Sequence, residues 1–519
     1  MKKVIVIGGG IAGLSTAYYL QKQAAEAGIP IDCTLIESAP RFGGKIATMR
    51  RDGFVIEGGP DSFLTQKPWA LQLARELGLY DRLLGTNDDR RKVYVLSNGR
   101  LVELPDGVML VVPTKIMPFV TSPLISWPGK LRMGLDLVIP PRRLNGDESL
   151  ASFIRRRLGQ EALDKIAEPL MAGIHVADPE RLSLQATFPR FIDLEQKHGS
   201  LIRGMLRRKG ERGKGKGEKG EGEKEKREKG KRRRGEKGKR EKEAGHNRSS
   251  NLQSPMLRRG SAQVSNPQSP ISMFMSLRGG LTELVDALVS HLDHRATLLA
   301  GRRVERIVSQ PDAESAYEMR LDDGGALEAD AVVLATPAYV SANLVEALNP
   351  DLAAGLRQIR YVSTATVSLG FRESDLRRPL DGFGFVIPHS EKRRIAACTW
   401  TSTKFDHRAP GDHVLIRSFV GGAYDEHLVD LDDDAMTRMV RDELADIMGI
   451  TAEPTTVEIF RWRKGNPQYD VGHLERVAAL EATCDPGLFL AGSAYRGVGL
   501  PDCVKNGRET AEQLVEYLG

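Results

Sequence analysis

The chain has 519 residues, of which 40% are hydrophobic and 28% are charged. This composition is typical of a soluble globular protein, excludes a fibrous or wholly disordered chain, and at this length predicts two to four domains. The formal net charge is +6, but residues 203–260 hold 23 Lys+Arg and 9 Asp+Glu, so the rest of the chain carries −8. We therefore expect an acidic folded body and no nucleic-acid partner for it.

No membrane span and no disulfide framework are predicted. Apolar runs never reach the roughly 18 residues of a membrane helix, and the run at residues 4–7 meets glycines too early for a signal peptide. The four cysteines, Cys33, Cys398, Cys484 and Cys503, lie far apart and form no CxxC pair. This usage is typical of a reducing compartment, so we expect a cytoplasmic protein.

The first 45 residues predict a strand, a glycine-rich turn, a helix and a second strand. Residues 4–7 are a β-branched run of the kind found in a strand buried on both faces. Residues 14–24 have helical character, and residues 33–36 form a second apolar run that ends at Glu37. Together they predict a βαβ unit.

The next part of the chain predicts a helix, a hairpin and a helical region. Residues 70–84 predict an amphipathic helix, and residues 93–104 predict a β-hairpin around the turn pair Asn98-Gly99. Residues 106–146 are rich in proline and apolar side chains, and residues 148–176 predict helices that are broken at Pro169.

Residues 209–245 consist almost entirely of Gly, Lys, Glu and Arg. Such a stretch can form no hydrophobic core, so we expect a disordered insertion that continues through the polar residues 246–271. Order is expected to resume near Phe274. The remaining predictions are a helix over 281–292, strands over 304–308, 317–321 and 331–335, three or four strands between 362 and 420, a strand over 488–491 and a helix over 505–517.

A GxGxxG motif fills the turn after the first strand. In a strand–turn–helix setting it predicts a dinucleotide site: the first glycine permits the tight turn, the second lets the backbone approach a pyrophosphate, and the third lets the helix pack on the strand. The helix N-terminus favours phosphate, and Glu37, 24 residues beyond Gly13, is expected to accept hydrogen bonds from ribose hydroxyls. The six motif residues predicted to bind the cofactor are Gly8, Gly9, Gly10, Ile11, Ala12 and Gly13.

Three further segments, at residues 37–45, 54–62 and 489–503, resemble glycine-rich segments of the flavin amine oxidase superfamily. The resemblance implies FAD, with Arg41 of the first segment facing the phosphates, the second segment close to the flavin ring, and a helix N-terminus of the third beside the ring. The further residues that it assigns to the cofactor are Glu37, Ser38, Arg41, Gly44, Lys45, Gly59, Pro60, Asp61, Ser62, Val304, Trp462, Gly492, Val498, Gly499 and Leu500.

We therefore predict an α/β fold class, with a discontinuous Rossmann-like FAD-binding domain, a mixed-sheet substrate domain and a helical insertion domain. The predicted segments are residues 1–85, 273–345 and 461–519 for the FAD-binding domain, 86–205 for a substrate and helical domain, 206–272 for the disordered insertion and 346–460 for the substrate domain.

Segments 466–473 and 495–503 resemble the protoporphyrinogen and coproporphyrinogen oxidases of haem synthesis, and residues 384–388 and 397–402 look like the soluble bacterial branch of that family. The resemblance covers nearly the whole chain outside about 209–270. It implies an oxygen-dependent flavoenzyme that turns coproporphyrinogen III into coproporphyrin III by three successive two-electron oxidations, with hydrogen peroxide as the other product. Protoporphyrinogen IX stays open as an alternative substrate. The expected partners are the porphyrinogen, O₂ and a downstream chelatase that receives the product.

The four propionates of coproporphyrinogen need cations. Plant-type members of the family carry a basic residue where this chain has Val93, so neighbouring cations are the candidates instead. The residues predicted to contact the substrate are Lys67, Arg91, Lys92, Gln468 and Tyr469. No side chain is assigned as a catalytic base, His473 is expected to be structural, and no metal site is predicted.

Other functions stay open. An amine oxidase or a carotenoid desaturase could share this fold, but an amine oxidase is expected to carry an aromatic pair near Tyr495, which is followed here by Arg496-Gly497-Val498. A binder of nucleic acid or anionic membranes could act through residues 209–245, but a mixed Lys/Glu pattern without aromatic residues disfavours this. Apolar side chains within residues 106–146 could contact a membrane surface or pack in a core. These side chains are Met109, Val111, Val112, Met117, Phe119 and Trp127.

Overall fold

The computed structural model describes residues 1–519 except 107, 110–111, 114, 143–145, 208–271 and 311–315. The predicted disordered insertion, residues 206–272, lies almost wholly outside the described residues, and so does Val111. Within the described ranges, no helix is long and apolar enough to span a membrane.

Five parallel strands form the sheet that carries the N-terminal motif. Their spatial order is β12 (Thr297–Ala300), β2 (Ile31–Glu37), β1 (Lys2–Ile7), β16 (Ala331–Leu334) and β22 (Leu488–Leu490). β1 lies at the centre, and its residues 4–7 are buried. Because these strands come from distant parts of the chain, the sheet confirms the discontinuous Rossmann-like organisation that the sequence predicts.

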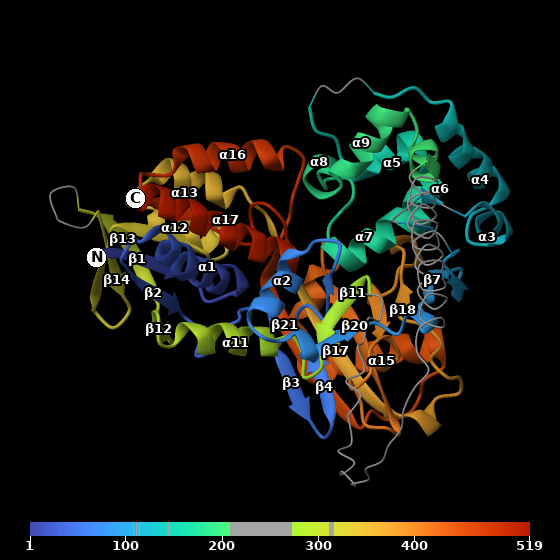
Figure 1. Ribbon diagram of the computed structural model, residues 1–519. Helices are drawn as coiled ribbons and strands as arrows, with labels where there is room; N and C mark the ends of the chain where they lie inside the picture. Colours follow the sequence, from blue (N-terminus) through green and yellow to red (C-terminus); the bar gives the residue numbers. More distant parts are fainter. Residues whose placement is uncertain (107, 110–111, 114, 143–145, 208–271, 311–315) are drawn as a thin grey trace, which may run out of the picture.

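Alternate residues of β1 face two separate cores. Val4 and Val6 pack under α1 (Ile11–Ala27), α11 (Thr282–Leu292) and α17 (Leu500–Leu518). Ile5 and Ile7 face a second layer. This layer holds α12 (Ala338–Val345), α13 (Pro350–Arg357), α16 (His473–Thr483) and the antiparallel strands β13 (Val304–Ser309), β14 (Tyr317–Leu321) and β15 (Ala326–Ala329). α1 and α17 lie side by side (Figure 1).

The second large sheet has seven strands and is mixed, as predicted. Its spatial order is β21 (Thr456–Pro467), β17 (Tyr361–Arg372), β20 (His413–Gly421), β19 (Ala397–Trp400), β18 (Gly384–Val386), β7 (Val93–Ser97) and β8 (Arg100–Glu103). Neighbouring strands are antiparallel except β18 and β7. α15 (Asp433–Met448) covers one face, and β4 (Phe54–Glu57) contacts the other. The hairpin predicted around Asn98-Gly99 is confirmed as β7–β8.

A helical unit, residues 116–207, follows this hairpin and packs around its own core. Figure 1 shows it beyond one end of the seven-stranded sheet, where α7 (Glu168–His175) contacts β18. Its other helices include α3 (Ile116–Thr121), α4 (Trp127–Gly134), α5 (Leu150–Arg157), α6 (Gln160–Ala162), α8 (Leu184–Thr187) and α9 (Pro189–His198). Smaller elements elsewhere are α2 (Trp69–Glu76), α14 (Thr401–Lys404), β3 (Thr48–Arg51), β5 (Phe63–Leu64), β6 (Leu83–Gly85), β9 (Val108–Met109), β10 (Val112–Pro113) and β11 (Phe274–Leu277).

Three predicted helices differ from the structure. The helix predicted over 70–84 ends at Glu76, because Gly78 takes a φ of +74° and turns the chain toward β6. Pro169 does not break the helices of residues 148–176, because α6, a π-helical turn over Leu163–Ala167 and α7 follow one another without a gap, and the π turn directly before Pro169 changes the hydrogen-bonding register where its N–H is missing. The break falls instead at Gly159, whose φ is +93°. The helix predicted over 505–517 begins earlier, at Leu500.

Two elements pack with a different sheet from the one to which the predicted domain segments assign them. α13 packs in a core of the parallel sheet, although it falls in the predicted substrate segment 346–460. β21 pairs with β17 along most of its length. The first residues of the predicted FAD-binding segment 461–519 therefore belong to the seven-stranded sheet.

Candidate cofactor and active site

The turn between β1 and α1 needs Gly8 and Gly13 for the backbone to pack as it does, and it leaves Gly10 open. Gly8 has a φ of +112°, and its N–H donates to the Ile36 carbonyl at 2.8 Å. A Cβ on Gly13 would overlap the Gly8 carbonyl oxygen, so only glycine lets α1 approach the turn this closely. A Cβ on Gly10 would meet no atom within 4 Å. The space beside Gly10 therefore suits a ligand that touches the backbone.

Two helices present uncapped N-termini toward this region. Gly10 is the N-cap of α1 and supplies no side-chain cap, and the first turn of α1 holds no acidic residue. Gly499 is the N-cap of α17 and also supplies no side-chain cap, but the first turn of α17 holds Asp502, whose carboxylate is paired with Lys67 at 2.6 Å. A Cβ on Gly507 would lie 2.7 Å from the Ala12 carbonyl oxygen, so the helices touch there. Leu500 is seven residues earlier in α17, roughly 10 Å along the helix axis. The two N-termini thus suit an extended anionic ligand.

Glu37 is fixed at the end of β2 by the backbone of the turn. Its carboxylate accepts hydrogen bonds from the N–H groups of Gly9 and Ala39, both at 2.7 Å, and from the Ser38 hydroxyl at 3.3 Å. The N–H of Arg302 donates to the Glu37 carbonyl at 3.0 Å, which brings the start of β13 to this end of the site. Val304, the first residue of β13, is buried there.

The segment after β2 folds back onto the glycine turn. Gly43 N–H donates to the Gly9 carbonyl at 2.7 Å, and a Cβ on Gly44 would lie 3.2 Å from the Gly10 Cα. The Arg41 guanidinium donates to the carbonyls of residues 42, 44 and 46 at 2.7–3.2 Å. Arg41 therefore organises this loop, and its contact with phosphates stays a prediction. The Lys45 ammonium donates to the Gly465 carbonyl, and burial lowers the pKa of Lys45.

The Gly58-Gly59 turn is tightly enclosed. A Cβ on Gly59 would overlap the Lys45 carbonyl, and a Cβ on Gly58 would overlap the Phe460 ring. The Trp462 indole N–H donates to the Gly58 carbonyl at 2.8 Å. The loop continues through Pro60 and Asp61 to Ser62, whose hydroxyl donates to the Asp61 carboxylate at 2.6 Å. The structure therefore brings this loop together with Lys45 and Trp462.

The C-terminal glycine segment is held by residues 469 and 473. The Tyr469 hydroxyl donates to the Ser493 carbonyl at 2.8 Å and accepts from the Gly497 N–H at 2.7 Å. The His473 ring stacks on Tyr469 at 3.8 Å between ring centres and donates from Nε2 to the Tyr495 carbonyl at 2.8 Å. Burial lowers the pKa of His473 to about 4, so the ring is a neutral structural group, in agreement with the sequence.

The substrate contacts predicted for Gln468 and Tyr469 stay predictions. The side chains of Gln468 and Tyr469 are both buried. The Gln468 amide nitrogen lies 3.3 Å from the Asn466 carbonyl, and Tyr469 is used by the backbone of the glycine segment. Tyr469 therefore supports the turn before α17, whereas the amide oxygen of Gln468 is buried and has no hydrogen-bond partner among the described residues.

The predicted substrate cations fall in different places. Lys67 forms an ion pair of 2.6 Å with Asp502, in the first turn of α17. Lys92 pairs with Asp381 at 2.9 Å next to the β7–β8 hairpin. The Arg91 guanidinium lies 3.3 Å from the Met273 sulfur. Of these three cations, Lys67 is the one that the structure brings to the C-terminal glycine segment.

The sequence analysis missed a group of buried charges behind the Gly58-Gly59 turn. Arg417 of β20 donates to the Gly59 carbonyl at 2.6 Å, and Lys404 pairs with Asp61 at 2.8 Å. An arginine inside the apolar run of residues 413–421 was the available signal. No group of three metal-ligating side chains occurs within the described ranges.

A family model described as "Flavin containing amine oxidoreductase" matches residues 11–515. The chain belongs to this family. Membership implies a flavin cofactor, and the open glycine cradle with two uncapped helix N-termini fits such a group.

Named relatives match over the full length of the chain. The coproporphyrinogen III oxidase of Bacillus subtilis (strain 168) is 35% identical over 100% of this chain and 98% of its own. The coproporphyrinogen III oxidase of Propionibacterium freudenreichii subsp. freudenreichii is 38% identical over 99% of this chain and 90% of its own. A crystal structure of a protein from Exiguobacterium sp. 255-15 superposes with a TM-score of 0.77 and 31% identity, covering 99% of both chains.

Proposed function

We propose that the chain is an FAD-dependent oxidase that converts coproporphyrinogen III to coproporphyrin III, with O₂ as the electron acceptor. The observation that carries this proposal is the full-length similarity, at 35% and 38% identity, to two bacterial enzymes of that name. Protoporphyrinogen IX is the alternative substrate. The four cysteines are free thiols, which agrees with the predicted cytoplasmic location.

The protein's own residues would bind and orient the cofactor. The uncapped N-terminus of α1 and the Gly10 backbone would hold the pyrophosphate, and the carboxylate of Glu37 would hold the ribose. The Gly58-Gly59 turn and the N-terminus of α17 would meet the flavin ring, where a helix dipole favours added negative charge. Bound FAD supplies the two-electron oxidation chemistry.

The position of Tyr495 argues against an amine substrate. An amine oxidase is expected to present an aromatic pair near this residue. The Tyr495 side chain is only 1% exposed and lies in the core beneath α12, α13 and α16. It therefore cannot form an aromatic wall around an amine, and the porphyrinogen reading is favoured over the amine oxidase.

The test is an aerobic assay of the purified protein with coproporphyrinogen III and protoporphyrinogen IX in parallel, after its visible spectrum is recorded. We expect flavin absorption bands and faster porphyrin fluorescence from the four-propionate substrate. A preference for protoporphyrinogen IX would keep the family and change the substrate. Flavin bands without either activity would turn the search to amines and carotenoids, and absence of bands after added FAD would refute the proposal.

We also propose that the helical unit attaches to an anionic membrane surface. Five large apolar side chains on and directly after α4 are exposed, and the most exposed are Trp127 (64%), Leu131 (72%) and Val138 (75%). The ammonium of Lys130 lies 4.7 Å from the centre of the Trp127 ring, so a cation accompanies the apolar side chains. Amphipathic surfaces of this composition bind at the headgroup level. Phe119 is buried in the core of the helical unit, which is one of the two alternatives that the sequence left open for it.

Cosedimentation with phosphatidylglycerol/phosphatidylcholine vesicles tests this attachment. We expect the double substitution W127S/L131S to reduce binding at least severalfold, because it removes two of the exposed large apolar side chains. The matched control is Tyr80→Ser, which changes a side chain that is 50% exposed away from the helical unit. Equal sedimentation of all three proteins would refute the attachment.

A further inference from the structure

Five charged side chains gather behind the Gly58-Gly59 turn, and we call them the buried charge cluster. They come from β4 and the loop after it, from α14 and the loop after it, and from β20. The cluster consists of Glu57, Asp61, Lys404, Arg408 and Arg417. Arg417 is only 3% exposed, and Arg408 and Glu57 are buried as well, whereas the side chains of Asp61 and Lys404 are partly buried, each 15% exposed. Burial of charge is costly without compensation, so the contacts of each member show what the cluster does.

Arg417 is aimed at the turn. One terminal nitrogen of its guanidinium donates to the carbonyls of Gly58 at 3.2 Å and Gly59 at 2.6 Å. The Gly58 carbonyl also accepts from the Thr366 hydroxyl at 3.2 Å and from the Trp462 indole at 2.8 Å. A carbonyl oxygen has two lone pairs, so three donors on Gly58 fix and polarise this peptide strongly.

Arg408 supports the loop that contains Asp61, and it does so through Ser276. Its guanidinium donates to the Ser276 hydroxyl at 2.8 Å and to the carbonyls of Leu277 and Arg278, each at 3.0 Å. The Ser276 hydroxyl in turn donates to the Asp61 carbonyl at 2.7 Å. All the acceptors bonded to Arg408 are neutral, so its positive charge is not cancelled by a bonded carboxylate.

The cluster carries an excess of positive charge. Although burial alone would raise it, Lys404 and Arg417 hold the pKa of Asp61 well below its usual range, so Asp61 is ionised and pairs with Lys404 at 2.8 Å. Burial raises the pKa of Glu57 to about 7, against hydrogen bonds from the Leu281 N–H and the Thr48 hydroxyl. Three cations therefore face one full carboxylate and one partly protonated carboxyl group near neutral pH.

We infer that Arg417 is a positioning residue for the flavin: it fixes the Gly58-Gly59 turn against the ring and, together with Lys404 and Arg408, places positive charge that favours the reduced cofactor. This inference rests on the proposed function. Two-electron reduction of a flavin adds two electrons and one proton at neutral pH, so the reduced ring carries a negative charge. A cation shielded from solvent acts on that charge more strongly than a surface cation does.

Two substitutions of Arg417 separate its charge from its hydrogen bonds. Arg417→Met removes both, so we expect roughly tenfold weaker FAD binding, as for the loss of a charge-assisted hydrogen bond, and a more negative midpoint potential. Arg417→Lys keeps the positive charge on a shorter side chain. We expect weaker FAD binding, because the hydrogen bonds to the turn are lost, and a midpoint potential close to that of the unchanged protein, because the charge remains. FAD affinity is read from fluorescence titration of the apoprotein, and the potential from equilibration with redox dyes.

Arg157→Met is the matched control, because Arg157 is an equally buried arginine in the helical unit, in a different core from the cluster. It is expected to lower thermal stability without changing the flavin potential. If Arg417→Met does not fold, Lys404→Gln tests the charge alone, because the Lys404 ammonium donates to the Asp61 carboxylate and the Ser62 hydroxyl and not to the Gly58-Gly59 carbonyls. It should also shift the potential to more negative values.

The outcomes separate this inference from the proposed function. A folded Arg417→Met variant with FAD affinity within twofold of the unchanged protein and the same potential overturns the inference, while porphyrinogen oxidation by the unchanged protein leaves the proposed function intact. An unshifted potential in Lys404→Gln overturns the electrostatic part. If the unchanged protein binds no flavin, the proposed function fails and this inference fails with it.

Discussion

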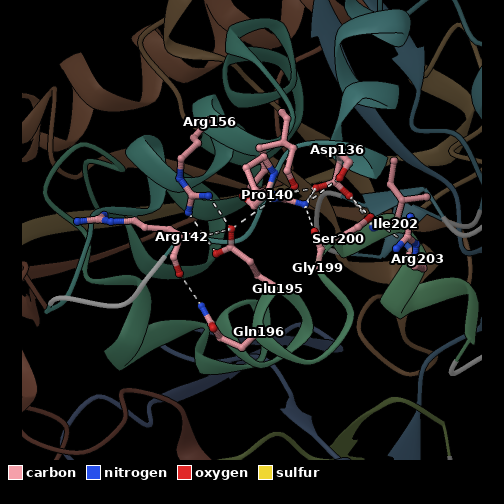
Figure 2. Close-up of polar contacts among 12 residues, drawn as sticks. Asp136, Pro140, Arg142, Arg156, Glu195, Gln196, Gly199, Ser200, Ile202 and Arg203 are labelled. Carbon is pink, nitrogen blue, oxygen red and sulfur yellow. Dashed lines mark hydrogen bonds and ion pairs between the residues drawn. The ribbon is translucent and has the colours of Figure 1, made fainter.

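Arg157 and Asp136 form an ion pair whose two side chains are completely buried in the helical unit. The Arg157 Nε lies 2.6 Å from Asp136 Oδ1, and the other carboxylate oxygen accepts from the Ser200 hydroxyl at 2.6 Å. Glu195 extends the network by accepting from Arg156 (Figure 2). Since Asp136 follows α4, the pair anchors the segment that carries the exposed apolar side chains proposed to touch a membrane.

Removing either partner of this pair should destabilise the helical unit strongly. Arg157→Met leaves the buried carboxylate of Asp136 without a cation, which typically costs about 3–5 kcal/mol in the free energy of unfolding. Asp136→Leu leaves Arg157 only its longer contact with Glu195 at 3.4 Å, so we expect a loss toward the lower end of this range. The double variant should lose much less than the sum of the single losses, because no charge is left unpaired. Urea denaturation followed by circular dichroism measures this. The control Lys505→Ala breaks an exposed pair with Glu509 and should cost at most about 0.5 kcal/mol. Additive losses would contradict the proposed pairing.

Gly10 and Gly13 should respond differently to alanine. Gly10→Ala meets no protein atom within 4 Å, so the apoprotein should keep its melting temperature while FAD binding is lost, because the new methyl group occupies the ligand space. Gly13→Ala would strike the Gly8 carbonyl and should lower the melting temperature of the apoprotein itself. Differential scanning fluorimetry with and without FAD separates the two. Normal FAD binding by Gly10→Ala would place the cofactor elsewhere.

The sequence predicted the glycine turn well because its requirements are local. Gly8 needs a positive φ, and Gly13 must admit the carbonyl of a residue only five positions earlier. Both needs follow from a strand that turns directly into a helix. The same holds for the β7–β8 hairpin, where Asn98 and Gly99 both take positive φ. Patterns of this kind can be recognised without knowledge of the rest of the chain.

The role of Arg417 could not be predicted because its partners are remote. It bonds to the Gly58 carbonyl across a separation of 359 residues. Tyr469 shows the same limit: its hydroxyl bonds to the backbone of Ser493 and Gly497, 24 and 28 residues away, and its motif did not indicate either contact. Which side chain reaches a ligand and which reaches the backbone is decided by tertiary packing, and a single sequence does not contain that information.

We expect Lys67 to contribute more than Lys92 to the binding of a substrate carboxylate. Lys67 lies at the N-terminus of α17, whereas Lys92 pairs with Asp381 beside the hairpin. We expect Lys67→Met to raise the KM for coproporphyrinogen III about five- to tenfold, and to affect protoporphyrinogen IX less, because that substrate has fewer propionates. Asp502→Asn, which keeps the ammonium, should not raise the KM. Steady-state kinetics on both substrates decides this, and a larger effect of Lys92→Met would move the carboxylate contact to the hairpin.

His473 should make the protein sensitive to acid. Burial lowers its pKa to about 4, from an ordinary value of 6.5. The unfolded chain therefore binds more protons than the folded chain between these values, so this contribution to stability is complete above about pH 6.5 and is lost as the pH falls toward 4. His473→Gln cannot titrate but can still donate to the Tyr495 carbonyl. When the pH is lowered from 8 to 5, the midpoint of unfolding in guanidinium chloride should fall less for His473→Gln than for the unchanged protein.

Two comparisons make the His473 measurement specific. His294→Gln changes an exposed histidine. As the pH falls, this variant should lose as much stability as the unchanged protein does. Glu57, whose pKa burial raises to about 7, contributes stability that is lost as the pH rises, which is the opposite sign. Because Glu57 is present in every variant, its contribution cancels in the differences. Equal pH dependence of His473→Gln and the unchanged protein would mean that the buried imidazole is not the group that titrates on unfolding.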